Sequence, residues 1–216
     1  MTKSLKVSLA LIAAAVLVFV GSLVVSQALK PPAAPPVQNA NPLLSPPLVR
    51  DDSPRLSQGS EAVFVEFLDF ECEGCLALYP VVEDLRARYG DRVTFVVRYL
   101  PLHGNSVNAA LAAEAAREQG KFEQMYKKLF ESVGAWGHQQ TSQEDMIIGY
   151  AESLGLDMAK FRTTFKDPAT MARIQQSQAD AQTLEVSGTP TVFLNGQRIE
   201  LSTAADLQKA FDDALR

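Results

Sequence analysis

The chain has 216 residues, 47% of them hydrophobic, which is enough to bury one sizeable core with further segments around it. Its formal net charge is -5 at pH 7, and the sequence contains no basic stripe. This charge argues against nucleic acid as a partner, because proteins that bind nucleic acid present clustered positive charge to the phosphates.

Residues 7–25 form an apolar segment without a charged side chain. Its length matches the roughly 20 residues of a membrane-spanning helix and exceeds the roughly 7–15 apolar residues of a usual signal peptide. Lys3 and Lys6 precede it, so the positive-inside rule places residues 1–6 in the cytoplasm and the rest of the chain outside. We therefore expect a single-pass anchor in the cell membrane and an extracytoplasmic domain.

A cleaved signal peptide is the alternative interpretation of the same segment. Ser26-Gln27-Ala28 places small residues where a signal peptidase cuts, and cleavage there would release a secreted protein. In both cases the bulk of the chain faces an oxidising compartment, in which disulfides persist.

Residues 26–60 are predicted to be a flexible linker. Three proline pairs, Pro31-Pro32, Pro35-Pro36 and Pro46-Pro47, lie among Ala, Asn and Ser residues. Such a composition buries too little apolar surface to fold, and it favours polyproline II or disorder. We expect this segment to act as a stalk between the membrane and a globular domain that begins at residue 61.

The globular domain, residues 61–216, begins with a strand, a helix and a second strand. Residues 62–68 are an almost continuous apolar run, which is typical of a central strand covered on both faces. A helix is predicted over residues 72–89, and residues 92–100 form a second β-rich run. Strand, helix and strand in this order predict a right-handed parallel crossover.

Helical patterns follow over residues 104–184, and strand patterns then return. Residues 191–194 and 198–201 flank the turn Asn195-Gly196, which predicts a hairpin, and residues 207–215 show the spacing of a final amphipathic helix. The order βαβ, helical segment, ββα predicts an α/β protein with a thioredoxin-like fold and an all-helical insertion.

The two cysteines of the chain, Cys72 and Cys75, form a C-x-x-C motif at the predicted junction of the first strand and helix. This arrangement is typical of thiol–disulfide exchange, in which one thiolate attacks a disulfide and the other cysteine resolves the mixed disulfide. Cys72 is the expected nucleophile, because the unpaired N–H groups and the dipole of a helix N-terminus favour a thiolate. Cys75, one turn into the helix, is expected to be more buried.

A zinc site is the alternative use of the two thiols. Zinc takes four ligands, and beyond the cysteines the chain offers only His103, His138 and carboxylates, without a second C-x-x-C motif. We therefore expect no metal and no other cofactor. Both histidines are expected to be ordinary loop residues without a catalytic role.

Glu66 lies six residues before Cys72, within the first predicted strand. It shares one strand face with Phe64 and Leu68, so its carboxyl group is expected in apolar surroundings, where desolvation raises the pKa. The alternative is an acid at the edge of a sheet, exposed to solvent.

Three segments resemble DsbA-type thiol–disulfide oxidoreductases. They are Phe64 to Cys75, which contains the C-x-x-C motif; Arg98 to His103, followed by an Ala-rich stretch and Gly120-Lys121-Phe122; and Val186 to Gly196. Together they cover roughly residues 61–216, in the order found in that family. The resemblance implies a thioredoxin-like fold with a helical insertion and a redox-active disulfide between Cys72 and Cys75.

The resemblance also implies roles for three further residues. Glu66 matches a buried acid that passes a proton to or from the resolving cysteine. Pro190 matches a cis-proline, and the backbone of Thr189 before it is expected to pair with an extended substrate. The implied substrates are unfolded or partly folded exported proteins with cysteines, and a membrane redox partner would reoxidise the site.

The dipeptide between the cysteines departs from the pattern of that family. Strongly oxidising members carry a histidine there, whereas this chain has Glu73-Gly74, and Asp69 and Glu71 add negative charge nearby. An acid beside the nucleophile disfavours a second negative charge. Cys72 is therefore expected to be less acidic, and the protein a weaker oxidant, than in those members.

A disulfide oxidase that acts on exported proteins is the function expected from these features. A reductase or isomerase would use the same two cysteines and stays open as an alternative. The alternative outside enzymes is a tethered chaperone-like or zinc-binding module.

Overall fold

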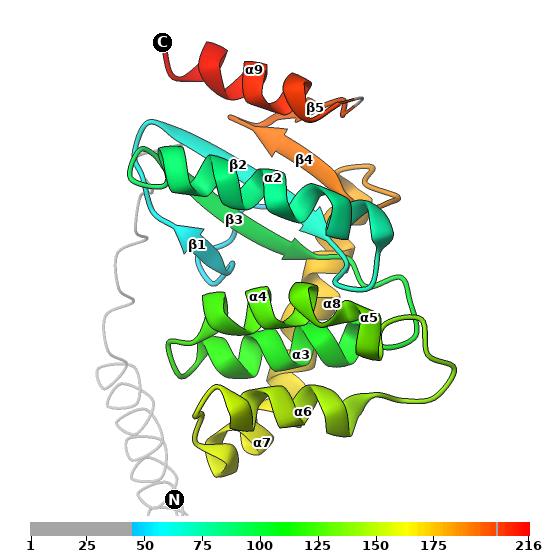
Figure 1. Ribbon diagram of the computed structural model, residues 1–216. Helices are drawn as coiled ribbons and strands as arrows, with labels where there is room; N and C mark the ends of the chain where they lie inside the picture. The colour runs from blue at the N-terminus through cyan, green and yellow to red at the C-terminus, as the bar shows by residue number, and fades with distance from the viewer. Residues whose placement is uncertain (1–44, 202) are drawn as a thin grey trace, which may run out of the picture. The chain divides into compact units, whose positions relative to one another are not determined.

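The computed structural model describes residues 45–201 and 203–216, in which the strands form one five-stranded sheet (Figure 1). The strands are β1 (Arg55–Ser57), β2 (Ala62–Leu68), β3 (Val93–Tyr99), β4 (Thr191–Leu194) and β5 (Gln197–Ile199). Their order across the sheet is β1-β3-β2-β4-β5. The central strand β2 pairs in parallel with β3 and antiparallel with β4, as expected of a βαβ unit followed by a hairpin.

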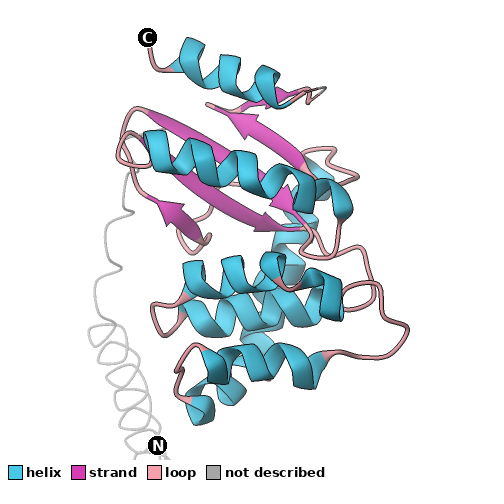
Figure 2. Cartoon of the chain, viewed as in Figure 1, coloured by secondary structure: helices cyan, strands magenta, loops and turns pink. Residues whose placement is uncertain are grey.

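The helices cover the sheet and form a further layer beside it (Figure 2). They are α2 (Glu73–Tyr89), α3 (Ser106–Arg117), α4 (Phe122–Glu131), α5 (Val133–Trp136), α6 (Glu144–Ser153), α7 (Met158–Phe165), α8 (Pro168–Thr183) and α9 (Ala204–Ala214). Helices α3 to α8 lie between β3 and β4 along the chain, where the sequence predicts the helical insertion. The elements on either side form the thioredoxin-like α/β fold.

All seven residues of β2 are buried, because helices cover both faces of the sheet. On one face, Phe64 packs against Phe95 of β3 and Phe211 of α9, at ring-centroid distances of 5.2 and 5.6 Å. Helix α2 contributes to the same apolar cluster. On the opposite face, Val65 clusters with Ala181 of α8. This double cover explains why β2 is apolar at nearly every position instead of alternating.

The helical insertion is built around α3, whose alanines are buried. Their small side chains allow α4, α6, α7 and α8 to approach closely, and all four helices contact α3. Leu68, Phe70 and Cys75 belong to the same apolar cluster as the buried face of α4. The insertion therefore packs against the end of β2 and the first turn of α2.

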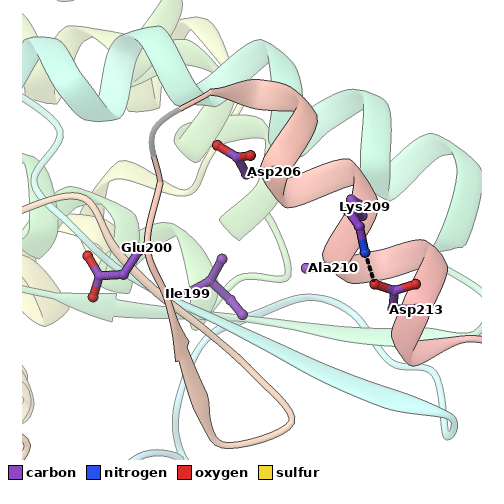
Figure 3. A pocket seen from close by; sticks show the side chains of 6 residues that line it. All are labelled: Ile199, Glu200, Asp206, Lys209, Ala210 and Asp213. Atoms are coloured by element: carbon purple, nitrogen blue, oxygen red, sulfur yellow. Dashed lines mark hydrogen bonds and ion pairs between the residues drawn. The ribbon is translucent and has the colours of Figure 1, made fainter.

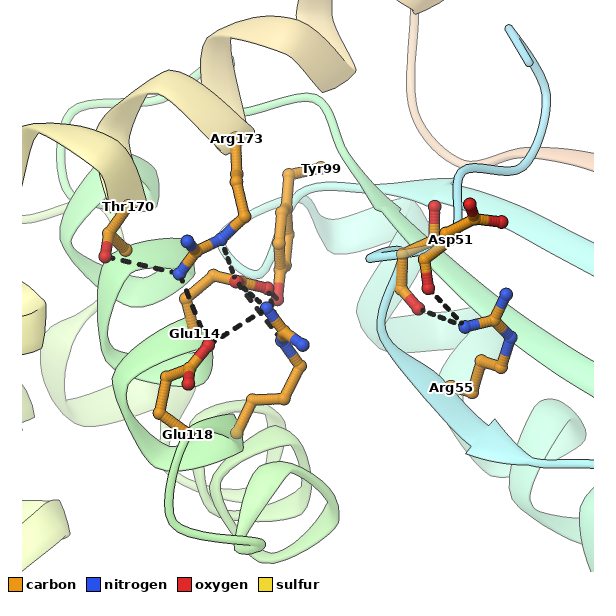
Figure 4. A network of polar contacts seen from close by, with 9 residues as sticks. Asp51, Arg55, Tyr99, Glu114, Glu118, Thr170 and Arg173 are labelled. Atoms are coloured by element: carbon orange, nitrogen blue, oxygen red, sulfur yellow. Dashed lines mark hydrogen bonds and ion pairs between the residues drawn. The ribbon is translucent and has the colours of Figure 1, made fainter. Parts of the chain in front are cut away.

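A buried carboxylate joins the insertion to the sheet (Figure 4). Glu114 of α3 is 1% exposed and accepts a hydrogen bond from the hydroxyl group of Tyr99 on β3 at 3.0 Å. The guanidinium groups of Arg117 and of Arg173 on α8 donate to it at 2.9 and 2.8 Å. These partners replace the water that the carboxylate loses on burial.

The end of the predicted linker is folded. Residues 45–60 contain β1, and Val49 is buried. Arg55 of β1 donates to the carbonyl oxygen of Asp51 at 3.0 Å (Figure 4). The prediction of a flexible segment up to residue 60 is therefore wrong for this part of the chain, which is held by contacts that its composition does not reveal.

A buried cluster of charged side chains holds residues 45–60 against the sheet. Arg98 of β3, 3% exposed, donates to Asp180 of α8 at 2.5 Å. It also donates to the carbonyl oxygens of Pro47 and Leu48 at 2.8 and 2.6 Å. Arg50 donates to the same carboxylate at 2.6 Å, so two cations share Asp180.

The predicted anchor or signal peptide at residues 7–25 lies outside the described residues, as does the first part of the predicted linker. None of the helices in the described part of the chain is both long and apolar enough to cross a bilayer.

Helix α9 begins at Ala204, before Leu207, the first residue of the predicted apolar pattern. The reason is a capping box: Thr203 accepts from Asp206 N at 3.3 Å, and the Asp206 carboxylate accepts from Thr203 N at 2.7 Å. These two bonds satisfy N–H groups that would otherwise lack partners at the helix start.

Asp180→Asn is expected to lower the free energy of unfolding by about 3 kcal/mol at pH 7, because the Arg98 guanidinium is left buried without a full countercharge. Burial alone would raise the pKa of Asp180, but the hydrogen bonds from Arg50 and Arg98 outweigh it and hold the pKa below its usual value. The carboxylate therefore stabilises the fold above about pH 4, and the difference from wild type should shrink as the pH falls below that value. Urea denaturation at pH 7, 4 and 3 measures both effects.

Asp84→Asn is the matched control for this measurement. Asp84 pairs with Arg88 one turn further along α2, but their side chains are 61% and 45% exposed. An exposed pair of this kind contributes only about 0.3–0.5 kcal/mol. Equal losses in the two variants would contradict the anchoring role of the Arg98–Asp180 cluster.

Candidate active site at the start of α2

The C-x-x-C motif lies where β2 ends and α2 begins. Cys72 is the N-cap of α2, and its carbonyl oxygen accepts the first helical hydrogen bond from Leu76 N at 2.9 Å. Cys75 lies in the first turn and is fully buried, whereas Cys72 is partly exposed. Both are free thiols in this structure. Their difference in exposure is the one predicted from their positions.

The surroundings lower the pKa of Cys72 to about 5. The largest cause is the hydrogen bond from the Cys75 thiol; burial acts in the opposite direction, and the backbone N–H groups of Cys75 and Gly74 add to the lowering. These N–H groups are unpaired donors of the first helical turn, so the helix start itself favours negative charge. At pH 7 such a thiol is about 99% ionised, against about 3% for an ordinary cysteine.

The same contacts act on Cys75 in the opposite sense. Donation to Cys72 raises the pKa of Cys75 most, followed by burial and by the negative charge of Glu66. The sulfur of Cys75 also accepts a long hydrogen bond from Asp69 N at 3.5 Å. Cys75 therefore keeps its proton at neutral pH while Cys72 loses its own.

The acids around the motif do not dominate the ionisation of Cys72. The side chain of Glu73 is 78% exposed, so water and salt screen its charge. Asp69 and Glu71 are each 2% exposed, and hydrogen bonds stabilise their carboxylates. The pKa of Cys72 is lowered in spite of these three acids, and its acidity relative to DsbA-type proteins stays a prediction.

The start of α3 holds both buried carboxylates. The hydroxyl group of Ser106 donates to Asp69 and, at 3.1 Å, to Glu71. The backbone N–H groups of Leu102 and Asn105 donate to Asp69 and Glu71 at 2.7 and 2.8 Å. This link between the C-x-x-C loop and the insertion is not predicted from the sequence, in which its only signal is two acids at alternate positions in an apolar run.

The two histidines lie beside the motif, although the sequence gives no sign of it. His103 Nδ1 is 2.6 Å from Asp69 Oδ2. The backbone N–H of His138 donates to Glu71 at 2.6 Å, and its Nε2 is 3.3 Å from Glu73 Oε1. Residues 103 and 138 belong to separate loops, which only the packing of the insertion brings together.

Glu66 is buried in the middle of β2, 2% exposed, opposite Val97 of β3 and Val192 of β4. This confirms the buried acid that the apolar run predicts, and the alternative of an exposed acid at a sheet edge is wrong. Burial, and then the charge of Cys72, raise the pKa of Glu66 to about 8. Among the described residues, no hydrogen bond to the carboxyl group offsets this.

The loop before β4 meets the C-x-x-C motif. The Thr189–Pro190 peptide bond is cis, as the resemblance implies, and the Cys72 thiol donates to the carbonyl oxygen of Thr189 at 3.3 Å. A Cβ atom on Gly74 would lie 2.9 Å from Pro190 Cδ and 3.6 Å from Cys72 Sγ. Glycine at position 74 therefore allows the proline loop to lie directly against the motif.

Metal binding is the alternative use of the thiols. In residues 45–201 and 203–216, no group of three or more His, Cys, Asp and Glu side chains is arranged to hold a metal ion. Cys75 is fully buried, which leaves only one of the two thiols within reach of an ion from solvent.

A separate hollow of about 390 Å³ lies between β5 and α9 (Figure 3). It is lined by Ile199, Glu200, Asp206, Lys209, Ala210 and Asp213. Lys209 and Asp213 pair across one helical turn at 2.5 Å, so its cation already has a partner. This lining contains no thiol, and the C-x-x-C motif remains the candidate site.

The sequence profile of the family described as thioredoxin matches residues 57–213. The Na(+)/H(+) antiporter NhaA of Herminiimonas arsenicoxydans is 34% identical over 175 residues, which are 81% of this chain and 27% of that protein. NhaA 3 of Salinispora tropica is 41% identical over 137 residues, which are 62% of this chain and 20% of that protein. The chain thus spans at most 27% of the length of these two curated relatives.

Solved structures show the same fold. A thioredoxin-like oxidoreductase from Silicibacter pomeroyi DSS-3 superposes with a TM-score of 0.65 at 30% identity, over 76% of this chain and 93% of that chain. Alpha-DsbA1 from Wolbachia pipientis superposes with a TM-score of 0.68 at 18% identity, over 78% and 93% of the two chains. At that identity the second similarity concerns the fold alone.

In the reduced protein, iodoacetamide is expected to alkylate Cys72 and to spare Cys75. Cys72 is partly exposed with a pKa of about 5, whereas Cys75 is buried and protonated. The rate should rise around pH 5 and level off by about pH 7. Mass mapping of the alkylated peptide identifies the residue, and alkylation of Cys75 before Cys72 would reverse the assignment.

Glu66→Gln is expected to stabilise the reduced protein at pH 8 but not at pH 4. The ordinary pKa of the acid is 4.5 and its folded pKa is about 8, so the unfolded chain loses this proton first and wild-type stability falls as the pH rises between these values. An amide at position 66 keeps the shape of the side chain but cannot ionise. The variant therefore lacks the pH-dependent loss of stability, which amounts to roughly 2–4 kcal/mol at pH 8 in the wild type. Urea denaturation at pH 4, 6 and 8 measures it.

Glu152→Gln, at an exposed position of α6, is the control for that series and should leave stability unchanged at every pH. A Glu66→Gln variant that differs from wild type by the same amount at pH 4 and pH 8 would contradict the raised pKa of Glu66.

Proposed function

The chain belongs to the thioredoxin family and is a thiol–disulfide oxidoreductase, and we propose that it introduces disulfides into exported proteins through Cys72 and Cys75. The observation that carries this proposal is the opposite behaviour of the two thiols, since the contact that lowers the pKa of Cys72 raises that of Cys75. An accessible thiolate beside a buried, protonated thiol supports exchange with a substrate at one sulfur and resolution by the other.

The oxidative reaction begins with a disulfide between Cys72 and Cys75. A substrate thiolate attacks Cys72 Sγ, a substrate–Cys72 disulfide forms, and Cys75 leaves with the electron pair and takes up a proton. A second substrate thiolate then attacks the substrate sulfur of this mixed disulfide, and Cys72 leaves as a thiolate. The substrate has lost two electrons, which a membrane redox partner must remove from the reduced protein.

Glu66 is the proton donor in this scheme. Its pKa of about 8 keeps it protonated at neutral pH, and its charge would act on Cys75. When Cys75 leaves as a thiolate in a buried position, water has poor access, and a nearby neutral acid supplies the proton instead. In the opposite direction the Glu66 carboxylate would accept the proton of Cys75.

The low pKa of Cys72 supports the oxidative direction. Interactions that stabilise the thiolate exist only in the reduced protein, so they favour reduction of the disulfide and make it a better oxidant. A reductase or isomerase is the second candidate, and Glu73 favours it, because an acid beside Cys72 opposes the thiolate.

The substrate would bind along the cis-proline loop. The backbone of Thr189 lies beside Cys72, where an extended peptide could add to it as a strand. Leu76 and Leu102 are 38% and 53% exposed, and the two lie on α2 and in the loop that contacts Asp69. Unfolded proteins with cysteines offer both an extended backbone and apolar side chains for such a surface.

We place the domain outside the cytoplasm, held to the membrane by residues 7–25, with release after signal cleavage as the alternative. The Pro-rich segment would carry it away from the bilayer. Relatives named as Na(+)/H(+) antiporters support a membrane setting, since ion exchange of that kind takes place across a membrane. Antiport itself is not proposed for this chain, which matches a small part of those proteins.

The oxidised protein is expected to convert a reduced, unfolded protein with cysteines to its disulfide form, measured as loss of free thiols. Cys72→Ser and Cys75→Ser should each abolish this activity, because neither variant can form the intramolecular disulfide that oxidises the substrate. When reduced Cys75→Ser is instead given a substrate that carries a disulfide, it should accumulate a mixed disulfide, because the resolving thiol is missing. Cys72→Ser protein with wild-type activity would exclude the proposed enzyme and leave the chaperone-like alternative.

The reduction potential, measured by equilibration with glutathione, decides the direction. A value above about -200 mV supports an oxidase, and a value near about -270 mV supports a reductase. The second result would contradict the proposed direction while leaving the two cysteines as the redox pair.

A further inference from the structure

Two imidazole rings lie beside the C-x-x-C motif. His103 Nδ1 is 2.6 Å from the carboxylate of Asp69, and the backbone carbonyl of Asp69 accepts from Cys72 N at 3.2 Å. His138 Nε2 is 3.3 Å from Glu73, the residue that follows Cys72. The rings meet edge to face, 5.4 Å apart at 86°. The histidines therefore contact acids on both sides of Cys72.

The contact with Asp69 favours the protonated form of His103. Its hydrogen bond to Asp69 raises the pKa of His103 most; burial opposes this, and the charges of Asp69, Cys72 and Glu71 raise the pKa further. The Asp69 carboxylate is fully buried, whereas Glu73 beside His138 is 78% exposed. The ion pair at His103 is therefore less screened by solvent than the pair at His138.

The interaction between His103 and Cys72 is reciprocal. If the Cys72 thiolate favours protonation of His103, then protonated His103 favours the thiolate by the same free energy. The other charged groups at this ring are Asp69, Glu71 and, beyond His138, Glu73. Asp69 and Glu71 accept hydrogen bonds from the start of α3, which partly offsets their effect on the thiolate.

We propose that His103, oriented by Asp69 and covered by His138, is a positioning residue that stabilises the Cys72 thiolate and so helps to set the oxidising strength of the site. It acts through its charge and touches neither substrate nor the sulfur in the resolving step. This inference rests on the proposed function only in taking Cys72 as the reactive thiol, and it holds for either direction of electron flow.

The first test is the pH dependence of Cys72 alkylation by iodoacetamide in the reduced full-length protein. In His103→Asn, whose amide can still donate to Asp69, the pKa of Cys72 should rise by about half a unit at low salt. About 1 M KCl should move the wild-type pKa toward that of the variant and change the variant less, because only the wild type has the imidazolium to screen. An unchanged pKa in His103→Asn would overturn the proposal.

The second test needs no substitution at position 103. By reciprocity, the pKa of His103, followed by NMR of its ring protons, should be higher in the reduced protein than in the disulfide form, by the same half unit. The substitution Cys72→Ser should lower the pKa of His103 in the reduced protein by the same half unit. Equal values in the reduced and oxidised proteins would overturn the proposal even if His103→Asn failed to fold.

His138→Asn is the matched control. His138 has a φ of 55°, which asparagine tolerates, so the loop should keep its shape. Its effect on the Cys72 pKa should be smaller than that of His103→Asn, and an equal or larger effect would overturn the assignment to His103. If the wild-type protein showed no disulfide exchange with substrates while the pKa values of Cys72 and His103 still depended on each other, the proposed function would be rejected. This inference would then still stand.

Discussion

The burial of β2 on both faces is the constraint on which the site depends. Helices α2 and α9 cover one face and α8 covers the other, so Glu66 is only 2% exposed to solvent. The same packing fixes the end of β2, where the chain turns directly into α2 and leaves Cys72 at the helix start. The buried acid and the thiol at the helix start thus both follow from one buried strand.

The helical insertion is part of the site as well as of the core. The start of α3 binds the carboxylates of Asp69 and Glu71, which flank the motif on its N-terminal side. Without these hydrogen bonds, two buried negative charges next to Cys72 would each cost several kcal/mol and would oppose the thiolate. The insertion therefore makes a segment rich in acids compatible with an acidic thiol.

The sequence was informative where a local pattern decides the structure. The apolar run around Glu66 predicts a doubly covered strand, and the position of Cys72 predicts a thiol at a helix start; both features are observed. Contacts between distant segments were not predictable in this way. Arg50 looks like part of a linker until Asp180 is folded beside it, and His103 looks like a loop residue until Asp69 and His138 surround it. Such contacts depend on tertiary packing, which leaves no periodicity in the sequence.

The ionisable groups at the site behave as one coupled set. In the reduced protein the negative charge resides on Cys72, and both burial and that charge keep Glu66 protonated. In the proposed disulfide form Cys72 would carry no charge, and burial alone would hold the proton that Cys75 takes up in the proposed reaction. Once Glu66 had given up this proton in the proposed reaction and Cys72 had been released as a thiolate, the two negative charges would repel each other. Their repulsion favours reprotonation of Glu66 from solvent, which restores the neutral acid before the next cycle.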